Sequence, residues 1–424
     1  MNIEFSKRSF VGAALGTMIE YYDYSILGIF LPLISPLFFP GDSVYDSLVK
    51  GFYAMLVAML ARPLGGIFFG YLGDKYGRRK ALLCSMYGIA IATIIMGFTP
   101  TFYTIGIWAS VLMVATKSVQ VFCFGGEYNG AGIYVVEHAQ NKNEAFMGSL
   151  LTAMMLVGSL FASVIAYVTT LEGMPEHSWR FAFVFGGIIG ILGIIYRKNL
   201  DESPSFKPAK DHDLRFSTLL KNYPYQLMAG VFMGGFATLL FTTILYFINP
   251  ILMTKGIITK QELMLQQSAI ILIGIFALLT AGKIADKKSP IKVMRFGAFM
   301  LIVLSWPLLW IIDQGYFNLM FLAQTIFIII NECVLGPSNA LLKNMFPMQF
   351  RYRGASLSFT LGLSLIGGLT PIVENYLYKT TGSFSSISLW LIAIALGTYF
   401  SIKIAVVKSQ HSLNNALAFG EARG

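Results

Sequence analysis

Charged residues are scarce in this sequence. Asp, Glu, Lys and Arg make up 12% of its 424 residues, about half of the share in soluble globular domains. Hydrophobic residues make up 56%, and the mean hydropathy is +0.67. This composition excludes a soluble enzyme, a disordered chain and a nucleic-acid-binding protein, and it indicates a protein that crosses a lipid bilayer many times.

Several residue types and motifs that specify other functions are also rare or missing. Cys occurs three times, always in apolar runs, so we expect no disulfide framework. The four histidines show no metal-ligand spacing, and a Gly-x-x-x-x-Gly-Lys-Ser/Thr phosphate-binding loop is absent. The sequence therefore predicts no metal site, no cofactor and no ATP-driven pumping, and we do not expect an enzyme.

Long uncharged stretches dominate the sequence instead. Residues 81–116, 145–171 and 222–254 contain no Asp, Glu, Lys or Arg. A transmembrane helix needs about 20 mostly apolar residues, so the chain divides into twelve predicted spans. They begin near residues 10, 50, 81, 104, 145, 179, 226, 264, 294, 317, 354 and 384.

The distribution of basic residues predicts the orientation. If the N-terminus lies inside, 24 of the 31 Lys and Arg fall in the inside segments, five fall in outside loops, and Arg62 and Lys117 lie within spans. By the positive-inside rule, we expect a multi-pass protein of the cell (inner) membrane with both termini in the cytoplasm. This arrangement also explains the net charge of +10 without any nucleic acid.

The longest polar stretch lies in the middle and separates six spans from six spans, as in transporters built from repeats. We therefore expect an N-terminal bundle, a cytoplasmic central loop, a C-terminal bundle and a short cytoplasmic tail, at residues 1–196, 197–225, 226–407 and 408–424. A weak internal sequence repeat supports this division into two halves. Asp74 and Asp286 each follow a glycine by four residues and precede basic residues, after the second span of each half.

Residues 70–80 resemble the Gly-x-x-x-Asp-x-x-Gly-Arg-Arg loop of the major facilitator superfamily. Further stretches resemble the metabolite:proton symporters of that superfamily, namely Gly16-Thr-Met-Ile-Glu20-Tyr21-Tyr22-Asp23-Tyr24, Arg62-Pro63-Leu64-Gly65-Gly66, Gly125-Gly126-Glu127-Tyr128 and Gly367-Gly368-Leu369-Thr370-Pro371. That family includes proline/betaine, α-ketoglutarate, citrate and shikimate permeases. The resemblance implies an all-α fold of two pseudo-symmetric six-helix bundles and proton-coupled transport by alternating access.

Two acidic residues in the first span are candidates for the proton site. Glu20 and Asp23 are three residues apart and share a helix face, and Asp23 lies near the middle of the span. Two close carboxylates and burial both make ionisation costlier, which suits a group that must gain and lose a proton. The alternative is that one of them pairs with Arg62 or Lys117 as a fixed brace.

Arg62 and Lys117 are the positive charges at depth, and they are candidates for binding a substrate carboxylate. Gln120 lies one turn from Lys117, and Tyr24 lies one turn from Glu20. The superfamily often has Arg-x-x-Gln-Gly where this chain has Lys117-Ser-Val-Gln120-Val121, and Lys keeps the charge but loses the bidentate fork of Arg. The alternatives are helix packing around Arg62 and a tyrosine cage for a quaternary ammonium.

The tenth span offers acceptors from the other half of the chain. Asn331 and Glu332 lie near its middle and are candidates for binding a substrate ammonium or hydroxyl, although an interhelical hydrogen bond explains them equally well. Glu374 is expected close to the outer end of span eleven, where it reaches water. We expect Asp23, Arg62, Lys117 and Glu332 to face one central cavity.

A cytoplasmic gate is expected at the loops that carry the repeated aspartates. At 1.5 Å per residue, Glu127 lies about 15 Å nearer the cytoplasm than Lys117 and level with the loop charges. We expect a charge cluster that locks the inside gate and breaks on opening, formed by Asp74, Arg78, Arg79, Glu127 and Asp286. Static anchoring of the loops is the alternative.

Together these features predict proton symport of a small carboxylate-bearing metabolite, with a zwitterion such as proline or betaine as the first choice. The alternatives are symport of a dicarboxylate such as α-ketoglutarate and a proton-driven exporter. The expected partners are the substrate, protons and the lipid bilayer, and we expect a functional monomer. The tail after Lys408 is short and has no heptads, so no osmosensing coiled coil is expected.

Overall fold

The structure is a computed structural model that describes residues 7–76, 78–125, 135–136, 143–197, 216–346 and 351–421. In these ranges the chain forms helices joined by turns, with no strand. Ten helices are long and apolar enough to cross a membrane, and two shorter apolar helices cover Leu83–Phe98 and Trp179–Ile195. Within the described residues, the helices therefore match the twelve predicted spans.

The helices divide into two sets, which we call the N-terminal half and the C-terminal half. The N-terminal half consists of α1 (Lys7–Phe38), α2 (Val44–Met59), α3 (Ala61–Tyr76), α4 (Arg78–Phe98), α5 (Phe102–Ile105), α6 (Ile107–Phe124), α8 (Glu144–Thr169) and α9 (Trp179–Arg197). The short α10 (Phe216–Asn222) follows in the central loop. The C-terminal half consists of α11 (Pro224–Phe241), η1 (Thr242–Ile248), α12 (Asn249–Thr254), α13 (Lys260–Lys288), α14 (Pro290–Asp313), α15 (Phe317–Leu335), α16 (Ser338–Met345), α17 (Arg351–Thr381), η2 (Phe384–Ile387) and α18 (Ser388–Glu421).

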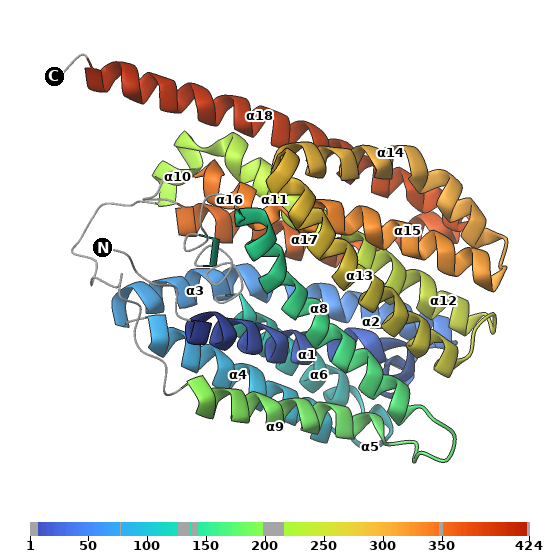
Figure 1. The fold of residues 1–424 in the computed structure, drawn as a ribbon. Coiled ribbons are helices and arrows are strands. Elements are labelled where there is room, and N and C mark those ends of the chain that lie inside the picture. Colours follow the sequence, from blue (N-terminus) through green and yellow to red (C-terminus); the bar gives the residue numbers. More distant parts are fainter. Residues whose placement is uncertain are drawn as a thin grey trace.

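The two halves pack side by side along their lengths (Figure 1). In the N-terminal half, α1 packs on α8 and α9, and α4 packs on α6 and α9. In the C-terminal half, α11 packs on α17 and α18, and α14 packs on α15 and α18. The halves meet where α8 contacts α13 and where α2 and α3 contact α17. The start of α1 and the end of α18 lie at the same end of the bundle, as an even number of crossings requires (Figure 1).

The seventh span is not one regular α-helix. A π-helical segment, η1, joins α11 to α12, and Pro250 lies in the first turn of α12. Proline cannot donate a backbone hydrogen bond, so a proline within a span loosens the helix that precedes it. The π-helix is rare and often marks a functional site, which draws attention to the side chains of η1.

The last helix is longer than expected. The sequence predicts the end of the span at residue 407, whereas α18 continues as a helix to Glu421. The residues after 408 include several good helix formers, and neither Pro nor Gly occurs before Gly420. Most of the predicted central loop, residues 198–215, lies outside the described residues.

Glycines bring helices into contact at several crossings. A Cβ atom added at Gly65 of α3 would clash with the backbone carbonyl of Phe122 in α6, and one at Gly125 would clash with the carbonyl of Arg62. The two backbones therefore approach each other through residues without side chains, which is the common device of membrane helices. This crossing fixes the position of the Arg62 backbone relative to α6.

We predict that Gly65→Ala destabilises the protein, because the added methyl group meets backbone rather than a movable side chain. Overpacking of this kind costs about 1–3 kcal/mol or more. Thermal unfolding of the purified protein in detergent should show a lower midpoint. Gly193→Ala is the matched control, because its Cβ would meet the flexible ends of Ile19 and Met86 at 3.0 and 3.4 Å. Equal midpoints for both variants would contradict the prediction.

Candidate functional site

A buried polar cluster lies between α1, α3, α4 and α6 in the N-terminal half. Its centre is Lys117, whose Nζ donates to the backbone carbonyl of Tyr24 at 3.0 Å and to Oε1 of Gln120 at 2.7 Å. The Gln120 Nε2 in turn donates to the carbonyl of Asp23 at 3.1 Å and to Oγ1 of Thr93 at 2.7 Å. The spacing of three residues places Lys117 and Gln120 on one face of α6, and together they bind the middle of α1.

Two cations lie close to the Tyr24 ring. The guanidinium carbon of Arg62 is 5.4 Å from the ring centroid, and Nζ of Lys117 is 5.0 Å from it. Arg62 also lies 4.9 Å from the ring centroid of Phe124, and its Nε has no hydrogen-bond partner. These distances allow cation–π attraction, which partly compensates for burying the two charges. Arg62 thus contributes both to packing and to the charge of the cluster.

Asp23 lies beside this cluster with no hydrogen bond to its carboxyl group. The residue is 1% exposed, and neither Oδ1 nor Oδ2 has a hydrogen-bond partner. Lys117 is close enough to interact with it electrostatically, but the ammonium donates to neutral oxygens instead. A buried carboxylate without donors is costly, and protonation removes that cost.

The space for the Asp23 carboxyl comes from glycines in α9. A Cβ atom at Gly186 would clash with Oδ1 of Asp23, and one at Gly190 would lie 3.5 Å from Oδ2. The carboxyl group therefore points toward α9, inside the N-terminal half. The spacing of four residues between these glycines is typical of close helix approach, and here it also accommodates an acidic side chain.

The other residues of the first span have different surroundings. Glu20 is buried, at 3% exposed. The Tyr22 hydroxyl donates to the carbonyl of Ala182 in α9 at 2.9 Å, whereas the Tyr21 ring lies 5.7 Å from the Tyr24 ring. Because Tyr22 binds α9 and two cations already lie close to Tyr24, the three tyrosines do not form an open cage for a quaternary ammonium.

The C-terminal half contributes buried acceptors on α15. Asn331 and Glu332 are both fully buried, and Nδ2 of Asn331 donates to Oε1 of Glu332 at 3.4 Å. Oδ1 of Asn331 and Oε2 of Glu332 have no hydrogen-bond partner. A Cβ atom added at Gly274 would lie 3.8 Å from both Glu332 Oε1 and Leu156, so Glu332 lies near the contact of α13 with α8.

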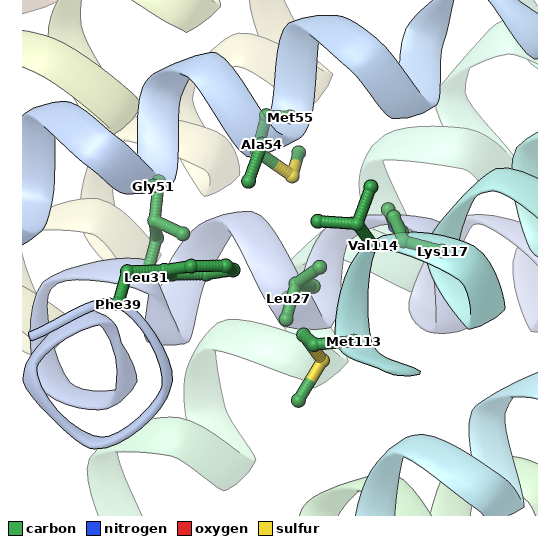
Figure 2. Close-up of a pocket in the computed structure, with 9 residues that line it drawn as sticks. All are labelled: Leu27, Leu31, Phe39, Gly51, Ala54, Met55, Met113, Val114 and Lys117. Carbon is green, nitrogen blue, oxygen red and sulfur yellow. The ribbon is translucent and has the colours of Figure 1, made fainter. Parts of the chain in front are cut away.

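Two of the four intramembrane charges, Asp23 and Glu332, have different surroundings in this structure. Asp23 points toward α9, and Glu332 lies near the meeting of α8 and α13. A small recess in the described part is lined by α1, α2 and α6 of the N-terminal half alone (Figure 2). Its walls are apolar apart from Lys117, and Leu27, Gly51 and Val114 lie around it (Figure 2).

Glu374 differs from its expected position. The sequence places it where it reaches water, but the side chain is fully buried. Oγ1 of Thr243 lies 2.5 Å from Oε1 of Glu374, and Oε2 has no hydrogen-bond partner. The prediction failed because it judged depth along one helix and could not foresee that η1 covers this face of α17.

At the end of the bundle where α1 begins, polar contacts join the two halves. The Asp286 carboxylate accepts from the backbone N–H groups of Ala145 and Phe146 at 2.8 and 2.9 Å. These groups lie in the first turn of α8, where a helix favours negative charge. Nearby, Lys343 of α16 forms a 2.7 Å ion pair with Glu144.

The remaining predicted gate residues cannot be placed at this end. Glu127 and the side chains of Asp74, Arg78 and Arg79 lie outside the described residues. The sequence reasoning did not identify Glu144, Lys343 or Thr93. The first two carried no signal beyond their charge in a loop region, and Thr93 was one of many hydroxyl groups in apolar runs.

The comparisons with known proteins agree with this architecture. The family model described as Major Facilitator Superfamily matches residues 13–371. The chain is 28% identical to the proline/betaine transporter of Escherichia coli (strain K12), over 92% of this chain and 81% of the relative. It is 29% identical to a putative proline/betaine transporter of Staphylococcus aureus (strain COL), over 92% and 86%.

The solved structures support the fold. The D-xylose-proton symporter matches with a TM-score of 0.73 at 16% identity, over 93% of this chain and 98% of that one. The fucose:proton symporter of Escherichia coli matches with a TM-score of 0.65 at 12% identity, over 94% and 98%. At these identities the likeness concerns the fold alone. With the family model covering most of its length, the chain belongs to the major facilitator superfamily and is a multi-pass secondary transporter of small molecules, not an enzyme.

Proposed function

We propose that this protein is a proton symporter for a small zwitterionic metabolite of the proline or betaine class. The observation that carries the proposal is the position of Asp23, which is buried without a hydrogen-bond donor beside a lysine that donates to neutral oxygens. The names of the relatives, which are proline/betaine transporters, support the substrate class.

Coupling follows from a competition for the two cations. When Asp23 is ionised, its charge compensates Lys117 and Arg62, so a substrate carboxylate gains little by binding there. When Asp23 is protonated, the two cations lack a counter-charge and attract the substrate carboxylate. Proton and substrate therefore favour each other's binding, which is the reciprocity that any symporter needs.

The charge balance favours a zwitterion over a diacid. The unpartnered oxygens of Asn331 and Glu332 on α15 offer a negative environment for a positive group. A substrate with one carboxylate and one cationic nitrogen would satisfy both halves, and binding both halves would draw them together. The site would lie between the halves at mid-membrane, as in transporters built from two repeats.

The contacts at the end where α1 begins would form the cytoplasmic gate. Asp286 binds the start of α8, and Lys343 binds Glu144, so both contacts cross from one half to the other. They must break when the protein opens toward the cytoplasm. The proposed cytoplasmic location of both chain ends follows the distribution of basic residues, and the proposed division at residues 197 and 226 follows the long polar stretch in the middle of the chain.

Uptake into liposomes tests the function. The purified protein is reconstituted with an inward proton gradient, and labelled proline, glycine betaine, α-ketoglutarate and shikimate are offered in parallel. We expect uptake of proline or betaine that depends on the gradient and is abolished by a protonophore. Uptake of α-ketoglutarate alone would overturn the zwitterion proposal and make Arg62 and Lys117 paired carboxylate clamps, and substrate release driven by the gradient would indicate an exporter.

We predict that Asp286→Ala shifts the protein toward an opening at the cytoplasmic end. Hydrogen bonds to a charged group contribute about 1.5–3 kcal/mol each, and the variant loses two of them, so the open fraction should rise at least tenfold. A cysteine is introduced by Asn339→Cys in a variant that lacks the exposed Cys84. The measurement is the rate at which this cysteine reacts with an impermeant thiol reagent. Asn339 is 2% exposed and binds α8 through Thr152, so reaction requires opening.

Asp313→Ala is the matched control for this prediction. Asp313 also accepts backbone N–H bonds at the start of a helix, those of Phe384 and Ser385, but both partners lie within the C-terminal half. We expect its loss to leave the labelling rate unchanged. Equal acceleration by both variants would indicate general loosening rather than a gate.

A further inference from the structure

One more buried carboxyl group, Glu374 of α17, has no place in the transport cycle described above. It is fully buried, its Oε2 has no hydrogen-bond partner, and its Oε1 shares a hydrogen bond with Thr243. A single buried carboxylate with one neutral neighbour is costly in a membrane protein, and such residues are functional by default.

Two oxygen atoms lie within hydrogen-bond distance of the Thr243 hydroxyl group. Oγ1 is 2.8 Å from the carbonyl oxygen of Leu239 and 2.5 Å from Oε1 of Glu374. A hydroxyl group has one hydrogen, and the carbonyl can only accept. If the Thr243 hydrogen goes to Leu239, as is usual for a threonine in a helix, the hydrogen of the second contact must come from the carboxyl group.

Within the described residues, the side-chain group recorded as acting on the Glu374 carboxyl is the neutral hydroxyl of Thr243. On the packed elements, Tyr45 of α2 interacts with Asp46 and with Tyr378 of α17, and the Lys255 ammonium lies 5.0 Å from the Tyr378 ring centroid. Within the described residues, the contact with Thr243 is the hydrogen bond that Glu374 makes, and no ion pair is formed with it.

Asn375, the residue after Glu374 in α17, takes part in a hydrogen bond between the two halves. The Tyr45 hydroxyl of α2 donates to Oδ1 of Asn375 at 2.5 Å, at the end of the bundle opposite to Asp286. When the halves separate at that end, this hydrogen bond breaks and water reaches the adjoining turn of α17. Glu374 is thus buried in the closed arrangement and placed to exchange a proton in the open one.

We propose that Glu374 is a second proton-binding site, located in the C-terminal half and loaded when the contact of α2 with α17 opens. The proton comes from the outer aqueous phase, binds a carboxyl oxygen, and leaves to water without any further reactant. Thr243 on η1 holds the protonated form by accepting its hydrogen. The role of Glu374 in transport rests on the proton coupling proposed above, whereas the protonation of Glu374 in the closed protein does not.

Infrared difference spectroscopy tests protonation without a substrate. In the purified protein at neutral pH, we expect a carbonyl band of a protonated carboxyl group in the difference between the wild type and Glu374→Gln, and this component should be retained in Glu332→Gln. Thr243→Val should shift this band, since the acid loses its acceptor, whereas Thr243→Ser should leave it in place. A protonated-carboxyl band of equal intensity in the wild type and in Glu374→Gln would overturn the proposal, and so would a Glu374 signal seen only as carboxylate.

The number of protons moved per substrate tests the role in transport. It is measured in liposomes from the membrane potential at which net substrate flux vanishes. We expect Glu374→Gln to lower this number by one, with downhill substrate flux preserved, because Gln imitates the neutral acid. An unchanged number, or flux that requires sodium ions instead, would overturn this role. If none of the offered compounds is transported, the proposed substrate class is wrong. The infrared measurement then still determines whether Glu374 is protonated.

Discussion

Asp23→Asn should strongly reduce accumulation of substrate against its gradient while sparing exchange of substrate across the membrane. Asn matches the neutral form of the acid in size, so it fits the space at Gly186 and Gly190 and preserves binding. It cannot release a proton, so substrate movement is no longer tied to the movement of the Asp23 proton. A potential of 100 mV is worth about 2.3 kcal/mol per charge, so the loss of this one proton should lower accumulation about 50-fold.

Two assays in the same liposomes separate coupling from binding. Net uptake under an inward proton gradient measures accumulation, and counterflow of labelled against unlabelled substrate measures exchange. Glu20→Gln is the matched control, because it removes the neighbouring buried carboxylate on the same helix face. Accumulation that is unchanged in Asp23→Asn and reduced in Glu20→Gln would move the proton site one turn along α1.

The sequence predicts most of the fold because the bilayer imposes a simple rule on it. Each span must be an apolar run of about 20 residues, and such runs are read directly from the chain. The ten long helices and two shorter ones of the described part lie where these runs are. The π-helix at Thr242–Ile248 was not predicted, since hydropathy does not report hydrogen-bond geometry within a helix.

The site is only partly readable from the sequence. Lys117 and Gln120 were identified because both lie on one helix, and the structure shows them bonded to each other. The neighbours of Asp23 and Glu374 come from helices that are distant in the chain, α9 and η1. Local spacing contains no information about such contacts, which explains why the water-exposed Glu374 was wrong, whereas the single central cavity stays a prediction.

The sequence identified Asp286 but not its partner. The segment around Asp286 repeats the pattern around Asp74, which indicated a special position, and the Asp286 carboxylate accepts hydrogen bonds from the first turn of α8. The sequence could not name this partner, because the backbone N–H groups at a helix start belong to no residue type. A repeated motif thus identified the residue, and packing between the halves determined its partner.

Lys117→Met should weaken substrate binding strongly, because it removes the cation that we expect to bind the substrate carboxylate. A hydrogen bond to a charged group contributes about 1.5–3 kcal/mol, so the Kd should rise roughly 10- to 150-fold. Equilibrium binding of the labelled substrate to purified protein measures the change. Lys117→Arg keeps the charge and should recover part of the affinity, although its planar fork does not reproduce the two bonds of Nζ to Tyr24 and Gln120.

A double variant separates this role from that of a fixed brace. If Lys117 only stabilises ionised Asp23, the damage in Lys117→Met comes from an uncompensated carboxylate, and adding Asp23→Asn should restore binding. If Lys117 binds the substrate, the cation is missing in both variants, and Asp23→Asn restores nothing. The two residues interact electrostatically, so their effects are not expected to add simply, and the sign of the coupling energy decides between the roles. Full recovery of affinity in the double variant would assign Lys117 to the brace and leave Arg62 as the remaining cation for the substrate.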